Sequence, residues 1–123
     1  MMMRYNKRFL RVVYGFVLKR DEVYDRAKLY LDNISDYGDR DDIVIVFSRK
    51  IIKASGLKKH GVLGMLLVYP DGERDHGTKV CFPLAENTMD WRMCLPPDEA
   101  VVKLKEYLGL GDDVQPSWHV PYY

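Results

Sequence analysis

Cysteine is scarce in this chain of 123 residues, which contains only Cys81 and Cys94. Two cysteines are too few for a disulfide framework, and neither has a second metal ligand at the spacing that zinc sites use. We therefore expect reduced thiols, no metal site and no cofactor. Cys81 falls inside a strand-like segment and Cys94 in a loop near Arg92, so Cys94 is the better candidate for a reactive thiol.

Long apolar runs are also missing, since no stretch approaches the ~20 apolar residues of a membrane-spanning helix. The 19 basic and 18 acidic residues give a net charge of +1, so the overall charge points to no class of partner. Apolar residues make up 47% of the chain and charged residues 30%, which excludes a disordered chain or a collagen-like repeat. The length and composition predict one domain covering residues 1–123.

The first twenty residues bear on localisation. They contain six basic residues and no acidic residue, which is the charge pattern of a mitochondrial presequence. They lack serine, however, and their apolar residues alternate as in a strand. Arg11 interrupts the apolar stretch that a secretory signal would need, and no small-residue cleavage site follows. We therefore expect a cytoplasmic protein with no membrane partner.

Apolar patterns in the first half of the chain predict a strand, a helix and a second strand. Residues 9–19 have apolar side chains on both faces of a period-2 ladder, as in a central strand, and Gly15 marks a bulge or a close approach. A helix with a buried stripe follows, beginning at Asp21 and ending at residues 37–38. Residues 43–47 form an unbroken apolar run rich in β-branched side chains, which predicts a strand covered on both faces.

The second half predicts a hairpin and another helix. Residues 62–69 and 78–84 have strand patterns and flank the turn residues 70–72. A further helix begins after Pro96 and Pro97 and ends at Gly109. Residues 49–59 fit either a short helix or an irregular edge strand, and the sequence does not decide between them.

These elements predict the order β-α-β-(short segment)-β-β-α followed by an aromatic C-terminal tail. The fold class is α+β, a single-domain two-layer sandwich of about four strands with helices on one face. A β-α-β unit crosses over with a right hand, so residues 9–19 and 43–47 are expected to pair in parallel as neighbouring strands. Residues 114–123 are expected to dock as a tail, and their prolines exclude them from the middle of a sheet.

Motifs for catalysis are absent from the sequence. The glycines between residues 56 and 64 have neither a Gly-Lys-Ser/Thr ending nor the spacing of a dinucleotide loop, and the acidic loop 36–42 lacks the pattern of an EF-hand. A small hydrolase remains possible if the three histidines converge. These are His60, His76 and His119. Because a chain of this length carries about that many by composition, we name no catalytic residue.

Charge alternates in blocks along the chain. Residues 1–20 and 43–60 carry only basic charges, +6 and +5, whereas residues 21–42 and 61–123 each carry a net −5. If the two basic blocks lie side by side in the sheet, they form a positive surface for nucleic acid or another polyanion. The candidate residues are Arg8, Arg11, Arg49, Lys50, Lys53, Lys58 and Lys59. Alternatively, the basic blocks neutralise the acidic ones within the fold or across a dimer interface, which the low net charge favours.

The aromatic tail favours a protein-binding role, since Trp and Tyr are enriched at interface hot spots. The candidate interaction residues are Trp118, Tyr122, Tyr123 and Trp91. We therefore interpret the sequence as a small non-enzymatic module that binds a protein partner or itself as a homodimer. Nucleic-acid or polyanion binding through blocks 4–20 and 49–59 is the alternative, and the histidine-dependent hydrolase is the third hypothesis.

Overall fold

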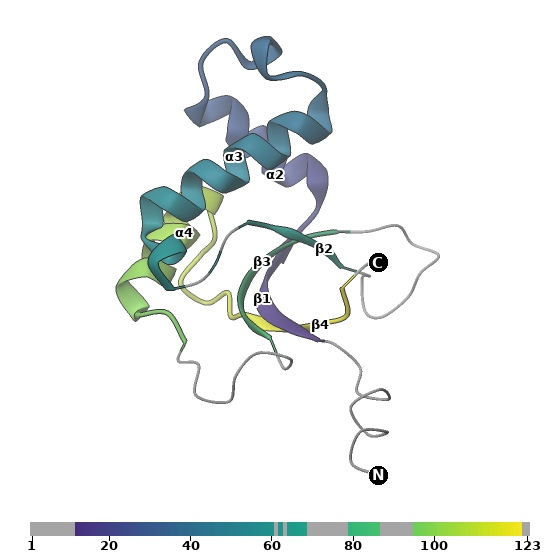
Figure 1. The fold of residues 1–123 in the computed structure, drawn as a ribbon. Helices are drawn as coiled ribbons and strands as arrows, with labels where there is room; N and C mark the ends of the chain where they lie inside the picture. The colour runs from purple at the N-terminus through teal and green to yellow at the C-terminus, as the bar shows by residue number, and fades with distance from the viewer. Residues whose placement is uncertain (1–11, 61, 63, 69–78, 87–94, 122–123) are drawn as a thin grey trace.

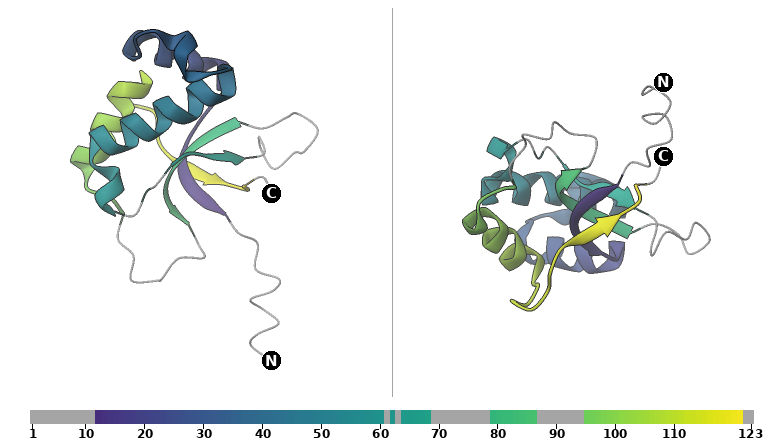
Figure 2. Two further views of the ribbon diagram at one scale, coloured as in Figure 1. Left: turned by 45° about the horizontal axis from the view of Figure 1, so that its top comes forward. Right: turned by 90° about the horizontal axis from the view of Figure 1, so that it is seen from below.

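The computed structural model describes residues 12–60, 62, 64–68, 79–86 and 95–121 (Figure 1). In these residues a four-stranded antiparallel sheet packs against three α-helices, so the predicted α+β class is confirmed. The helices lie together on one side of the sheet (Figure 2). Two short 3-10 turns are also present: η1 (Ile34–Tyr37) lies between α2 and α3, and η2 (Leu57–His60) follows α3 on the way to β2.

The sheet has the strand order β2-β3-β1-β4. Its strands are β1 (Val13–Leu18), β2 (Leu66–Val68), β3 (Lys79–Glu86) and β4 (Ser117–His119). The antiparallel pairing of β2 with β3 confirms the pairing predicted for the hairpin. β2 is shorter than the predicted strand 62–69, and the predicted turn residues 70–72 lie outside the described residues. β4 pairs with β1 at the edge of the sheet, where a proline-flanked strand is tolerated. A bridge between Val68 and Pro121 then brings the chain beyond β4 next to β2, so the two edges of the sheet approach each other.

One predicted strand is a helix instead. Residues 43–47 lie inside α3 (Arg40–Ser55), and most of the ambiguous segment 49–59 continues the same helix. The predicted parallel pair is therefore wrong, since the neighbours of β1 among the described strands are β3 and β4, both antiparallel. A short apolar run buried on one side of a helix has the same local pattern as a buried strand.

Capping residues at both ends of α3 explain why a helix forms there. The Asp42 amide donates to Asp39 Oδ1 at 2.9 Å, and the Asp39 amide donates to Asp42 Oδ2 at 3.3 Å. This reciprocal pair is a capping box that satisfies amides at the helix start. At the other end Gly56 adopts a left-handed conformation with φ of 89°, which is the usual helix stop.

The other two helices lie close to where the sequence places them. α2 (Arg20–Tyr30) begins one residue before Asp21, and Glu22 Oε1 accepts from the Lys19 amide at 2.9 Å. α2 ends at Tyr30, earlier than predicted, because residues 34–37 form the separate turn η1. α4 (Asp98–Leu108) begins after Pro97 and ends at Gly109, as predicted.

The main core lies between the sheet and the helices. Phe16 and Phe82 of the sheet and Phe47 of α3 are among its largest fully buried side chains. A smaller cluster on the other face of the sheet contains Val13, Val68 and Cys81. Burial raises the pKa of the Cys81 thiol to about 12, so Cys81 is an unreactive core residue at neutral pH.

Gly15 marks both a bulge and a close approach, as the sequence predicts. The register between β1 and β3 shifts between Tyr14 and Gly15. A Cβ atom at Gly15 would overlap the Phe82 carbonyl oxygen and lie 2.9 Å from the Cα atom of Pro83. Pro83 has no amide hydrogen, and an irregular point of the ladder is where a strand accommodates it.

Candidate functional site

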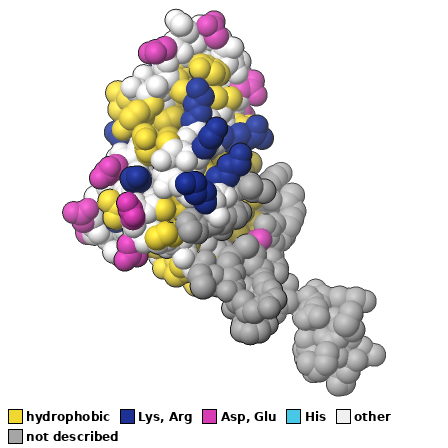
Figure 3. All heavy atoms as spheres, turned by 60° about the vertical axis from the view of Figure 1, so that its left-hand side comes forward, with side chains coloured by type: hydrophobic (Ala, Val, Ile, Leu, Met, Phe, Trp, Pro, Cys, Tyr) yellow, Lys and Arg dark blue, Asp and Glu magenta, His cyan; other side chains and the backbone are white. Residues whose placement is uncertain are grey.

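Five basic side chains of α3 and η2 lie at the C-terminal end of α3. We call this surface the basic face, and its members are Arg49, Lys50, Lys53, Lys58 and Lys59. All five residues are exposed, and four of them, all but Lys59, line one open hollow of about 400 Å³ with Ile52. Figure 3 shows Lys and Arg side chains gathered in a band on the helical side of the molecule.

The helical spacing of α3 and the turn after it assemble the basic face. Residues 49, 50 and 53 occupy the exposed side of α3 because its buried side carries Ile51 and Ile52. Gly56 then ends the helix, and its amide donates to the carbonyls of residues 52 and 53. Leu57 is fully buried and anchors η2, which leaves Lys58 and Lys59 facing solvent beside the helix.

Charged groups at the opposite end of α3 are paired. Arg20 lies 3.6 Å from Asp41, and Arg40 lies 3.0 Å from Asp21, so the N-terminal ends of α2 and α3 neutralise each other. By contrast, no member of the basic face forms an ion pair within the described part of the chain. The Arg20–Asp41 pair joins the basic block 1–20 to the acidic block 21–42 at one end of α3, and the other end is left with five cations.

The helix dipole accounts for part of this arrangement. Cations in the last turn of a helix interact favourably with its exposed carbonyls, and Lys53 is in that position in α3. Lys58 and Lys59 lie in η2, beyond the end of α3, so the dipole of α3 does not account for their charges. Dipole stabilisation alone thus does not explain why five cations share this surface.

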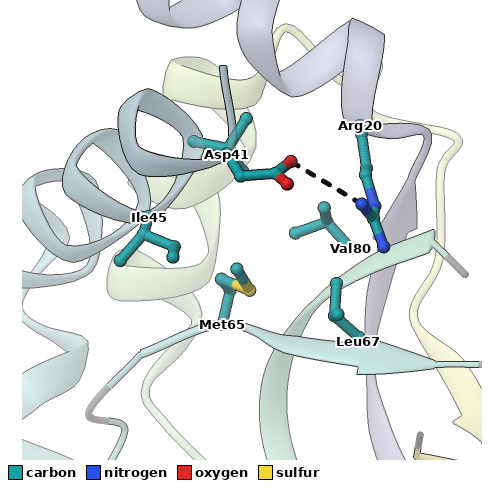
Figure 4. Close-up of a pocket in the computed structure, with 7 residues that line it drawn as sticks. Arg20, Asp41, Ile45, Met65, Leu67 and Val80 are labelled. Atoms are coloured by element: carbon teal, nitrogen blue, oxygen red, sulfur yellow. Dashed lines mark ion pairs between the residues drawn. The ribbon is translucent and has the colours of Figure 1, made fainter. Parts of the chain in front are cut away.

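A second hollow of about 150 Å³ lies between the start of α3 and the sheet (Figure 4). Its lining is mainly apolar, with Met65, Leu67 and Val80 on the sheet side, and the Arg20–Asp41 pair stands at one side of it. Both partners of that pair are well exposed, so it contributes at most about 1 kcal/mol to stability. The lining offers a carboxylate but no nucleophile, so we assign no chemistry to this hollow.

The structure brings only part of the predicted polyanion site together. The segment 43–60 is not a sheet neighbour of β1, so the sheet-based reason for joining the two basic blocks is wrong. Arg8 and Arg11 lie outside the described residues. The five remaining candidates are the members of the basic face, which come together through the helix rather than through the sheet.

Trp118 is the one predicted interaction residue that the structure describes. It lies on β4, is 53% exposed, and its ring centroid is 5.2 Å from that of Tyr14 on β1. Trp91, Tyr122 and Tyr123 lie outside the described residues. An exposed tryptophan therefore stands beside a half-buried tyrosine at the β1–β4 edge.

The predicted histidine cluster stays untested, because His76 and the side chain of His60 lie outside the described residues, as does Cys94. On β4, His119 Nε2 is 2.8 Å from Ser117 Oγ. Neither residue lines any of the hollows that open on the helical layer. For a serine hydroxyl to act as a nucleophile with a histidine as general base, a substrate cavity and an oxyanion site are also needed. We therefore assign no catalytic role to this pair.

Comparison with protein-family models, curated proteins and solved structures gives no match to this chain. Within the described residues, no helix has the length and apolar character needed to span a lipid bilayer. The same part of the chain has no group of three or more His, Cys, Asp or Glu side chains placed to bind a metal ion. A functional proposal therefore depends on the geometry of the surface.

Proposed function

We propose that this domain binds nucleic acid through the basic face. The observation that carries the proposal is the group of five exposed cations at one end of α3, without acidic partners among the described residues. Lys and Arg side chains of this kind neutralise phosphates and release condensed counterions, which is the main source of sequence-independent affinity for nucleic acid.

The shape of the basic face favours a polymer over a single small anion. Its hollow is open and is lined by the exposed side chains of residues 49, 50, 53 and 58, of which Lys50 also lies over the Tyr37 ring at 5.5 Å. A site for one phosphate or one small molecule more often encloses its ligand and offers fixed donors. A chain of phosphates instead needs several cations spread along a surface, without a buried pocket.

Binding to short oligonucleotides at increasing salt tests the proposal. Fluorescence anisotropy should detect binding at low ionic strength. In a plot of log Kobs against log salt concentration, the line should fall with a slope of about 0.7 per phosphate contact for a single strand. The variant K53Q/K58Q should weaken binding to all sequences and reduce that slope by about 1.4. No binding at low salt refutes the proposal.

Arg40 offers a matched control for these substitutions. Its guanidinium is 3.0 Å from Asp21 and lies over the Tyr24 ring at 4.3 Å, so it is already engaged within the fold. The variant R40Q removes one positive charge and should leave affinity and slope near those of the unmodified protein. A loss of log Kobs in R40Q that is half the loss in K53Q/K58Q, in proportion to the charges removed, would show that net charge, and not the basic face, governs binding.

Binding of a protein partner or self-association is the second candidate, and the exposed Trp118, which lies beside the half-buried Tyr14, favours it. A homodimer through this edge would change mass with concentration in sedimentation velocity, and W118S would return it to a monomer. A constant monomer mass that W118S does not alter would refute the homodimer.

For both candidates we propose a cytoplasmic location, because a free thiol such as Cys81 suits a reducing compartment.

A further inference from the structure

A third hollow opens where α2, α3 and α4 meet. We call it the tyrosine hollow; its volume is about 310 Å³, and it is lined by Tyr30, Ala54, Lys103, Glu106 and Tyr107. Three different helices contribute to it, so the sequence gives no local sign that these residues meet. Tyr30 and Tyr107 each lie next to the apolar side of their helix, a position that predicts packing in the core and not an open surface.

The aromatic rings of this hollow are held in place. The Tyr30 ring lies edge-on to Tyr107 at 5.3 Å and is stacked near the buried ring of Phe47 at 5.8 Å. Arg26 reaches the Tyr30 hydroxyl at 3.3 Å and donates to the Tyr107 carbonyl oxygen at 3.0 Å. The Arg26 guanidinium also lies over the Tyr30 ring, 5.6 Å from its centroid, but Tyr30 remains 48% exposed, whereas Tyr24 is half-buried. A fixed ring with an exposed surface is suited to stack against a flat ligand at little cost in side-chain entropy.

The tyrosine hollow adjoins the basic face. Ala54 lies directly after Lys53 and one helical turn beyond Lys50, so these residues are neighbours on the surface of α3. Ala54 is small and leaves space above the helix. Lys103 adds a cation to the lining and offsets the carboxylate of Glu106, so the hollow carries no net negative charge.

We infer that the tyrosine hollow is a base-stacking subsite and that the domain prefers single-stranded nucleic acid over a duplex. This inference depends on the proposed function, because the basic face would hold the phosphates on either side of the stacked base. Bases of a single strand can turn an aromatic face toward the protein, whereas bases in a duplex are already paired and stacked. Stacking on aromatic side chains is tolerant of sequence.

Variants at the two tyrosines test the subsite. Loss of one stacked base costs about 1–3 kcal/mol, so Y30L and Y107L should each weaken single-strand binding by roughly tenfold, within a range of about 5- to 150-fold. Duplex binding and the salt slope should stay unchanged, because the phosphate contacts remain. Y30F keeps the ring and should restore single-strand affinity.

Tyr24 supplies the control for loss of a tyrosine from α2. Its ring is already covered by Arg40 at 4.3 Å and Lys28 at 5.1 Å, so Y24L should not change the preference for single strands. Thermal unfolding of each variant identifies a general loss of structure, which would lower single-strand and duplex binding together. A loss confined to single strands cannot come from unfolding.

An abasic strand of the same length separates the two proposals. It keeps the phosphates and lacks the bases, so the unmodified protein should bind it about as weakly as Y30L binds the normal strand. Equal affinity for normal, abasic and duplex oligonucleotides would overturn the stacking subsite and leave the basic face intact. Absence of binding to all three would overturn both proposals.

Discussion

Replacing Ser48 of α3 with alanine is expected to stabilise the domain. The Ser48 side chain is fully buried, and its Oγ atom has no hydrogen-bond partner among the residues that the structure describes. A buried polar group left without a partner costs about 1–3 kcal/mol. Alanine removes that group and also has the highest helix propensity, which adds up to about 0.5 kcal/mol.

A small void opposes this gain. Removal of one oxygen atom leaves little space, and at ~24 cal/mol per Å³ the void costs a few tenths of a kcal/mol. The net effect of S48A is therefore a gain of about 1–2 kcal/mol in the free energy of unfolding. Urea titration followed by circular dichroism measures this gain, and the melting temperature should rise by roughly 3–8 °C.

Ser55 on the same helix provides the matched control. It is also buried, but its hydroxyl donates to the Ile52 carbonyl oxygen at 3.0 Å. S55A therefore removes a satisfied hydrogen bond and should be neutral or destabilising by up to about 1 kcal/mol. If S48A is destabilising, or if both variants shift stability equally, Ser48 has a partner and the reasoning is wrong.

Two further predictions follow from the sheet. G15A should destabilise the domain by about 3 kcal/mol, at the upper end of the usual cost of overpacking, because the new Cβ meets backbone atoms of Phe82 and Pro83 that cannot move aside as a flexible side chain would. A melting temperature equal to that of the unmodified protein would contradict this. The folded-state pKa of Cys81 lies above its ordinary value of 9.0, at about 12, so the free energy of unfolding should fall as the pH rises from about 9 to 12. Urea titrations across this range should show a smaller fall in C81A, and identical pH profiles would contradict the prediction.

Local chemistry in the sequence is enough to place several elements. Pro97 and Gly109 bracket α4, and Gly15 marks the bulge, because each of these residues restricts or widens the choice of backbone conformation by itself. The β2–β3 hairpin follows from two strand patterns around turn residues. None of these features depends on a distant partner.

The segment 43–47 was mispredicted because its local pattern fits two structures. Five consecutive apolar residues suit a strand covered on both faces, and they also suit the buried side of a helix start. The decisive signals lie on either side of the run: Asp39 and Asp42 have capping-box spacing, and Gly56 is a helix stop. Interpreting the aspartates as part of a solvated turn concealed the beginning of α3.

The basic residues of the candidate site are visible in the sequence, but their common surface is not. In a strand, Lys50 would point away from Arg49 and Lys53, since successive side chains alternate between faces. In a helix all three share the exposed side. The tyrosine hollow is harder still to predict, because Tyr30 and Tyr107 meet only when α2 packs near α4.

By itself, the sequence determined the α+β class, the residues that bound α4, the bulge at Gly15 and the blocks of like charge. Tertiary structure decided which charges are paired. Arg20 and Arg40 find Asp41 and Asp21 because α2 and α3 pack with their N-terminal ends together. That packing uses acids at one end of α3, and the cations at the other end have no acidic partner among the described residues, since Coulomb attraction depends on distance in space and not on distance along the chain.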